Sequence, residues 1–213
     1  MGMRRLWDEG RAAPWKVGNE LRRLGLWPLA RLYFAAHGVA WGADWRVYGL
    51  PLIQRQRGSR ITIGAGAQMR SWLSANPLGP NHRVILATRS AAAVIVVGCQ
   101  VGLTGTTLCA ETGITIGDRV RFGANCTVVD TDFHPLDAAA RLARPTAGKS
   151  RPVVIEDDVF VGMSVLILKG SHIGRGSVIG AGSVVAGMIP AGVVAAGNPA
   201  VVVRRLEDTD ARA

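Results

Sequence analysis

The sequence predicts an all-β solenoid: a prism of stacked coils built from short parallel strands, with a short helical segment before it and one inserted loop. Three observations predict this fold class. Aliphatic residues recur every six positions, Gly makes up 27 of the 213 residues with only 6% aromatics, and the period lapses over residues 131–152 before it resumes. Small and β-branched residues suit short strands joined by tight corners. We therefore divide the chain into a helical cap segment at residues 1–58, the prism domain at 59–206 and a tail at 207–213.

The N-terminal 58 residues do not repeat. The run LRRLGLWPLARLYFAAHG predicts one or two short amphipathic helices interrupted at Pro28, because proline lacks the N–H that a helix interior needs. Five tryptophans accompany them: Trp7, Trp15, Trp27, Trp41 and Trp45. We expect the segment to cap the open end of the prism. A face of tryptophan and arginine leaves peripheral contact with an anionic membrane as the alternative.

The strongest repeat starts at residue 153, where an aliphatic residue recurs every six positions and a small residue follows most of them. The recurring residues are Ile155, Val161, Ile167, Ile173, Ile179 and Val185, and two positions before each stand Val153, Val159, Val165, Ser171, Ser177 and Ser183. Positions two apart on a strand face the same side, so both sets point inward. Each hexapeptide then forms one face of a triangular prism with about eighteen residues per coil, and stacked coils bury a common core.

Weaker blocks of the same repeat lie upstream. The phase holds over Ile116, Phe122 and Val128, and it slips by one at residues 110–113. The earlier block places Ile85, Ala91, Val97, Leu103 and Cys109 at the inward position. The first match is ITIGAG at residues 61–66, which indicates that the prism begins near residue 60. Cys126 is also expected in the core.

The inserted loop at residues 131–152 opens with DTDFHP. Long loops in compact repeats are usually functional. Asp130, Asp132 and His134 share one side of this segment if its backbone is extended. A carboxylate facing an imidazole fixes its tautomer and stabilises the imidazolium, so Asp132 is expected to orient His134 as a general base.

A stretch covering residues 97–206 closely resembles hexapeptide-repeat O-acetyltransferases of the galactoside, maltose and nodulation-factor type. Three motifs carry the resemblance: the His-Pro pair that opens the loop, the return to register at PVVIEDDVFVG, and the closing IPAGVVAAGNPA before basic residues. The resemblance implies a left-handed parallel β-helix. It also implies a homotrimer with active sites in the grooves between neighbours, and acetyl-CoA bound along the coils as acyl donor.

The same motifs imply roles for individual residues. His134 becomes the catalytic base, Gly162 and Ala181 line the pantetheine channel, and Phe160 lies beside the thioester. The residues implied at the C-terminal end of the CoA site are Pro199, Arg204 and Arg205.

Two departures from the family pattern bear on specificity. The TKD that usually precedes the IP pair is Ala186, Gly187 and Met188 here, so another cation, Lys169 or Arg205, is expected to contact CoA. The acceptor-binding Asn expected near residues 103–106 is absent, which predicts an acceptor other than a simple galactoside or maltose.

We expect transfer of an acetyl group to a hydroxyl of a sugar or glycan intermediate, in a surface-polysaccharide or glycosylated-metabolite pathway. An alcohol at neutral pH needs a base before it attacks a thioester, and His134 would supply it. Candidate acceptor contacts are Glu111, Asp130 and His82. The alternatives are a non-sugar acceptor such as serine, an amino sugar or a drug, a non-catalytic trimeric scaffold, or a γ-type carbonic anhydrase.

Composition narrows the choice of partners. The net charge of +10 suits a polyanion, a membrane surface or phosphate-bearing ligands, but the arginines are scattered, so no nucleic-acid partner is expected. A carbonic-anhydrase zinc site needs a His pair and a third His, and His134 has no such mate, so no metal is expected. Three cysteines without CxxC spacing and the absence of a signal core or long apolar run predict a cytoplasmic protein.

Overall fold

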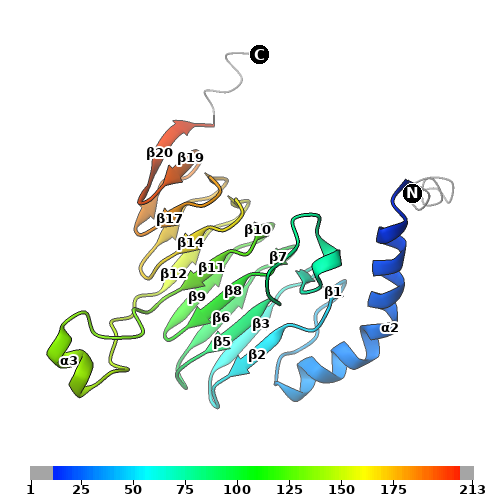
Figure 1. The fold of residues 1–213 in the computed structure, drawn as a ribbon, viewed down its shortest axis with the longest axis horizontal. Helices are drawn as coiled ribbons and strands as arrows, with labels where there is room; N and C mark the ends of the chain where they lie inside the picture. The colour runs from blue at the N-terminus through cyan, green and yellow to red at the C-terminus, as the bar shows by residue number, and fades with distance from the viewer. Residues whose placement is uncertain (1–11, 207–213) are drawn as a thin grey trace.

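The structure is a computed structural model that describes residues 12–206. In this range the strands form three sheets, which we call A, B and C, and each strand pairs in parallel with the strand three places further along the chain. The chain therefore visits A, B and C in turn, and coils of three strands stack on one another (Figure 1). The predicted coil of short parallel strands is confirmed. The last pair, β19 with β20, is antiparallel.

The strands of the three sheets have the following bounds. Sheet A contains β1 (Arg46–Tyr48), β4 (Gln68–Arg70), β7 (Gly102–Thr104), β10 (Arg121–Ala124), β13 (Phe160–Val161), β16 (Val178–Ile179), β19 (Val193–Gly197) and β20 (Ala200–Arg205). Sheet B contains β2 (Leu52–Arg55), β5 (Ile85–Thr88), β8 (Thr107–Ala110), β11 (Thr127–Val129), β14 (Leu166–Ile167) and β17 (Val184–Val185). Sheet C contains β3 (Arg60–Ile63), β6 (Val94–Val97), β9 (Gly113–Ile116), β12 (Val153–Ile155), β15 (His172–Ile173) and β18 (Met188–Ile189).

The core consists of inward rows in which one residue of each coil lies above its counterpart. All six aliphatic residues of the strongest repeat are buried, as predicted. The inner row of sheet B is Ile53, Leu86, Leu108, Val128, Ile167 and Val185. Parallel pairing in register repeats the same inward position from coil to coil, so the six-residue period of the sequence becomes a continuous apolar column.

In the block that runs from residue 85 to residue 109, the predicted inward position is wrong at three residues. Ile85 and Cys109 are only partly buried and Ala91 is exposed, whereas Leu86 and Leu108 are fully buried. Strands β5 and β8 have four residues each and carry two inward positions, so apolar residues stand at both phases and the six-residue count alone does not choose between them.

The prism begins earlier than the boundary at residue 59 predicts. Strand β1 pairs with β4 from Arg46 onward, and β2 pairs with β5 from Leu52 onward, which makes residues 46–63 a complete first coil. The tight six-residue spacing is absent there because the turn at Arg57 and Gly58 lengthens the first coil. Trp7 and the tail at residues 207–213 lie outside the described residues.

The N-terminal segment forms one helix, α2 (Pro14–Ala36), rather than two helices interrupted at Pro28. Pro28 lies inside the helix, and the helix axis changes direction midway in Figure 1. A proline inside a helix removes one hydrogen bond and bends the helix. Contacts with the rest of the protein keep α2 continuous through this bend. The contacts at its C-terminal end are Phe34, Trp41 and Trp45, which pack edge to face at the first coil.

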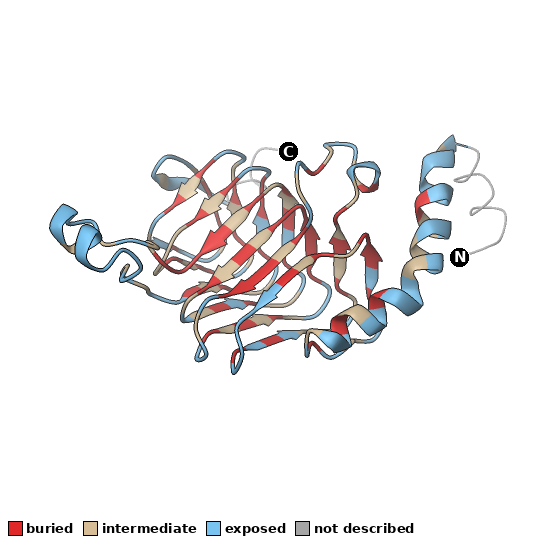
Figure 2. Ribbon diagram, turned by 60° about the horizontal axis from the view of Figure 1, so that its bottom comes forward, coloured by how far each residue is buried: buried red, intermediate tan, exposed pale blue. Residues whose placement is uncertain are grey.

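Two segments project from the prism. Residues 71–84 leave after β4 and contain the short helix η1 (Leu73–Ala75). The predicted inserted loop leaves after β11 and contains α3 (Ala138–Ala143), which stands clear of the coils in Figures 1 and 2. Its two ends are joined by a bridge between Thr131 and Ser150.

Candidate active site

The candidate residues gather at two different corners of the prism. The B–C corner, where the chain passes from sheet B to sheet C, carries Glu111, Lys169 and the inserted loop with His134. The A–B corner carries Gly162, Ala181 and the projecting residues 71–84. One chain therefore places its candidate base and its candidate CoA-binding corner on separate edges.

The imidazole of His134 is exposed at the base of the inserted loop, and its Nδ1 lies 2.6 Å from the carbonyl oxygen of Pro145. A carbonyl oxygen only accepts hydrogen bonds, so Nδ1 carries the proton. In the neutral ring Nε2 is then the unprotonated nitrogen, and within residues 12–206 it has no hydrogen-bond partner. This is the tautomer that a general base needs.

The carboxylate of Asp132 does not contact His134. Its Oδ1 lies 2.8 Å from Nζ of Lys169, and both side chains are about four-fifths covered. The expected shared side fails because Phe133 adopts a left-handed backbone with φ of 62°, so the segment is not extended. This ion pair holds the loop against the corner.

Phe133 links the loop to a further pair of charges. The guanidinium of Arg89 lies 4.9 Å from the centre of the Phe133 ring, and its Nε lies 3.1 Å from Oε2 of Glu111. Glu111 thus reaches the residue before His134 through Arg89 rather than touching the imidazole. Pro145, Lys169 and Arg89 were not predicted in these roles, since only the folded loop brings them beside residues 132–134.

Asp130 is structural rather than available to an acceptor. It is fully buried, and its carboxylate accepts hydrogen bonds from the backbone N–H groups of Glu111, Thr112 and Gly113 and from the Thr112 hydroxyl. A buried carboxylate requires such donors. They hold the turn between β8 and β9, which explains an aspartate at this position without an acceptor.

The candidate CoA residues are brought together on sheet A. Its registers place Phe160 opposite Val178, Val178 opposite Val194, and Val194 opposite Arg204. Arg121 stands opposite Phe160 at the other end of this row. Phe160 is 49% exposed, so the outer face of sheet A carries an apolar strip with an arginine at each end.

Gly162 and Ala181 flank this strip at the A–B corner, where their backbones stack directly on one another. Pro199 and Arg205 belong to the exposed hairpin of β19 and β20, with Arg205 opposite Val193. His82 lies in the projecting residues 71–84 near the same corner, and its Nδ1 is 2.7 Å from the carbonyl oxygen of Arg83.

The cysteines differ in environment. Cys126 is buried as predicted, and burial raises the pKa of its thiol to about 11. Cys109 is half-buried, and burial likewise raises the pKa of its thiol. Within residues 12–206 no three His, Cys, Asp or Glu side chains are grouped closely enough to hold a metal ion.

Comparison with known families agrees with this architecture. The model of the bacterial transferase hexapeptide (six repeats) matches residues 152–187, and the hexapeptide repeat of succinyl-transferase matches residues 113–129. These segments are hexapeptide repeats of the bacterial transferase kind, and the predicted resemblance to hexapeptide-repeat acetyltransferases is confirmed.

Among sequence relatives, galactoside O-acetyltransferase of Lactococcus lactis is 43% identical over 104 residues, which are 49% of this chain and 49% of that protein. The 2,3,4,5-tetrahydropyridine-2,6-dicarboxylate N-acetyltransferase of Clostridium perfringens is 51% identical over 57 residues, 27% of this chain and 24% of that protein. The matches thus span half or less of the relatives' length.

Solved structures show the same fold. A hexapeptide-repeat acetyltransferase from Vibrio cholerae superposes with a TM-score of 0.50 at 24% identity, covering 93% of this chain and 90% of that one. An N-acyltransferase from Bacillus cereus, solved with dTDP and 3-hydroxybutyryl-CoA, superposes with a TM-score of 0.56 at 16% identity, covering 78% and 81%.

Proposed function

We propose that this protein is an O-acetyltransferase that moves the acetyl group of acetyl-CoA to a hydroxyl of a sugar or glycan intermediate, with His134 as general base. The observation that carries this proposal is the hydrogen bond from Nδ1 of His134 to the Pro145 carbonyl. It leaves Nε2 ready to accept a proton on an exposed loop that projects away from its own prism.

The reaction follows from this tautomer. Nε2 of His134 takes the proton of the acceptor hydroxyl as the oxygen attacks the thioester carbonyl carbon. The new C–O bond forms, the C–S bond breaks, and the imidazolium returns its proton to the CoA thiolate. Pro145 stabilises the imidazolium by accepting from Nδ1, which assigns to a backbone carbonyl the orienting role that Asp132 was expected to have.

The outer row of sheet A suits the acyl donor. The methylene and dimethyl groups of pantetheine are apolar, and the strip of Phe160, Val178 and Val194 offers an apolar surface for them along the coils. Arg204 ends this strip with the positive charge that the CoA phosphates require. Pro199 and Arg205 border the same end, and Gly162 and Ala181 offer a flat corner beside the strip.

The site is completed by a second copy of the chain. The base lies at the B–C corner and the donor row on sheet A and the A–B corner, so neighbouring prisms must meet edge to edge. A homotrimer of parallel, left-handed coils closes three such sites by symmetry. The left-handed winding rests on the resemblance to hexapeptide-repeat acetyltransferases.

The relatives and the corner residues support a hydroxylated acceptor. The Lactococcus relative is named for O-acetylation of galactosides, whereas the Clostridium relative is named for N-acetylation. Glu111, paired with Arg89, lies beside the loop of His134, and His82 lies at the A–B corner. These positions support Glu111 and His82 as contacts of a hydroxylated acceptor. An amine acceptor is the second candidate, favoured by the N-acetylating relative.

The free cysteines and the CoA donor fit a cytoplasmic reaction.

The test is CoA release from acetyl-CoA with sugars, nucleotide-sugars, amino sugars and serine as acceptors. His134→Ala should lower turnover by about 100-fold to 10,000-fold, the range of a general base, with unchanged circular dichroism and oligomer mass. Turnover retained in the His134→Ala enzyme contradicts the role of the imidazole. Activity with amino sugars alone favours the second candidate.

A further inference from the structure

The helix α2 directs four of its leucines, Leu21, Leu24, Leu29 and Leu32, away from the protein. Its buried residues are Asn19, Ala30 and Phe34, which face the first coil and η1. The opposite face is apolar along its whole length, and we call it the outer row: Val17, Leu21, Leu24, Gly25, Pro28, Leu29, Leu32 and Ala35. Leu21 is 64% and Leu32 is 68% exposed. A surface helix ordinarily buries its leucines, so an exposed apolar row of this length marks a binding surface.

Basic and aromatic side chains border the outer row. Arg22 on one edge lies 4.6 Å from the Trp72 ring, and Arg31 on the other lies 4.8 Å from the Trp27 ring. Lys16 lies near the N-terminal end of the helix. Glu20 is the acidic residue of α2, and its carboxylate is engaged by Arg23 and the Tyr48 hydroxyl. The border of the row is therefore positively charged.

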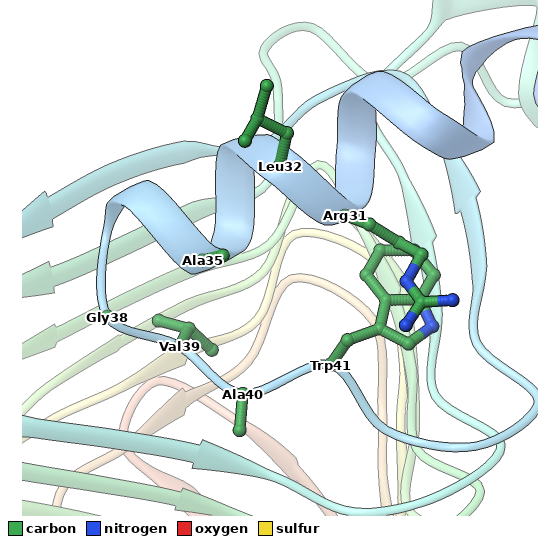
Figure 3. Close-up of a pocket in the computed structure, with 7 residues that line it drawn as sticks. All are labelled: Arg31, Leu32, Ala35, Gly38, Val39, Ala40 and Trp41. Carbon is green, nitrogen blue, oxygen red and sulfur yellow. The ribbon is translucent and has the colours of Figure 1, made fainter.

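A groove continues the outer row at its C-terminal end. Figure 3 shows the side chain of Arg31 reaching from the helix towards Trp41 of the returning segment, and Leu32, Ala35 and residues 38–41 also line this groove. They enclose a shallow, mainly apolar cavity of about 740 Å³. Apolar surface beside an arginine suits the boundary between acyl chains and anionic headgroups.

We infer that α2 lies on an anionic lipid bilayer, with the outer row in the acyl-chain boundary and Arg22, Arg31 and Lys16 among the headgroups. Within the described residues no helix is long and apolar enough to cross a bilayer, and α2 would lie in the plane of the interface. Charge complementarity selects this occupant over a second copy of the helix, because two such rows would bring basic borders together with no free carboxylate on α2. The bend at Pro28 also disfavours the regular interlocking of two helices.

Vesicle flotation of the purified full-length protein tests this inference. Wild type should float with vesicles of phosphatidylcholine containing about 30% phosphatidylglycerol, and should bind far less to pure phosphatidylcholine. Replacing two outer-row leucines, Leu24→Glu with Leu32→Glu, should weaken partition by about tenfold or more. Arg22→Gln with Arg31→Gln should weaken binding and reduce its dependence on salt.

The matched control is Leu136→Glu with Leu142→Glu, because these leucines of the inserted loop are 80% and 88% exposed. This variant should float like wild type. Wild type that fails to float with anionic vesicles overturns the inference, and so does equal binding to pure phosphatidylcholine. A smaller oligomer mass in the Leu24→Glu, Leu32→Glu variant would also overturn it, because a second copy would then cover the outer row. None of these outcomes depends on the proposed chemistry.

Discussion

Gly162 shows how closely successive coils approach at the A–B corner. A Cβ atom added to this residue would lie 2.6 Å from the backbone nitrogen of Ala181 and 2.8 Å from the carbonyl oxygen of Ile179. Neither atom belongs to a flexible side chain. Glycine is therefore required for stacking at this corner, whether or not a pantetheine chain passes beside it.

Gly162→Ala should lower the free energy of unfolding by about 1–3 kcal/mol, the usual cost of overpacking. Gly187→Ala is the control, because a Cβ there meets nothing within 4 Å and its φ is not positive. The control should stay within about 0.5 kcal/mol of wild type in urea unfolding. Equal stability of the two variants would contradict the close stacking.

Cys126 is buried, whereas Cys99 is exposed. Its thiol lies 3.0 Å from the carbonyl oxygen of Gly162, and burial raises its pKa from 9.0 to about 11. The folded protein therefore holds the thiol proton of Cys126 more tightly than the unfolded chain does. The stability that this thiol contributes is present below pH 9.0 and is lost as the pH rises towards about 11.

Alkylation distinguishes the two thiols. At about pH 8 iodoacetamide should modify Cys99 and leave Cys126 unmodified until urea unfolds the protein. Mass spectrometry of tryptic peptides gives the site. Rapid labelling of Cys126 in the folded protein would show that the corner between β10 and β11 opens.

At the scale of elements, the inserted loop is held by few contacts. Its ends meet at the bridge of Thr131 with Ser150, and Asp137 caps the N-terminus of α3, with its carboxylate accepting a hydrogen bond of 2.7 Å from the Ala140 N–H. Asp132 and Lys169 provide its ion pair with the prism. The position of His134 therefore depends on this ion pair together with the contact of Arg89 with the Phe133 ring.

Asp132→Asn and Lys169→Met should loosen the loop equally. Trypsin cleavage after Arg141 should become several-fold faster in either variant, and the double variant should add little, because both changes remove one interaction. Turnover should fall less than in His134→Ala. A loss of activity in Asp132→Asn as large as that in His134→Ala, without faster cleavage, would restore Asp132 as the orienting carboxylate.

At the scale of the whole molecule, the two corners cannot meet within one prism. The candidate base follows β11, between sheets B and C, while Phe160 and Arg204 lie on the outer face of sheet A. Three flat sheets around a rigid core keep these edges apart. The proposed chemistry therefore requires association of copies, and the mass of the oligomer should be about three times 22.5 kDa.

Mixed oligomers test the shared site directly. Chains with His134→Ala and chains with Phe160→Asp should each be almost inactive, and coexpression should restore about one quarter of wild-type turnover if each site takes one residue from each of two copies. Separately purified and unmixed variants are the control. No recovery in the mixed oligomers would place the reaction within one chain.

Much of the prism was predictable because its coils repeat one local rule. Each strand from β13 to β18 has two residues, of which the second is a buried aliphatic residue, so period and burial coincide. The rule weakens where strands lengthen: β5 and β8 carry apolar residues at both phases, and Leu86 and Leu108 point inward instead of Ile85 and Cys109. The start of the prism at Arg46 and the continuity of α2 through Pro28 were not predicted either, because strand pairing and packing override local propensity.

The sequence by itself determined the coil, the inserted loop and the resemblance to hexapeptide-repeat acetyltransferases, because each depends on spacing along the chain. Only the tertiary structure decided which groups meet. It paired His134 with Pro145 and Asp132 with Lys169, buried Asp130 under the N–H groups of a turn, and turned the leucines of α2 outward. A left-handed residue at Phe133 and contacts between distant coils set these partners, and neither leaves a period in the sequence.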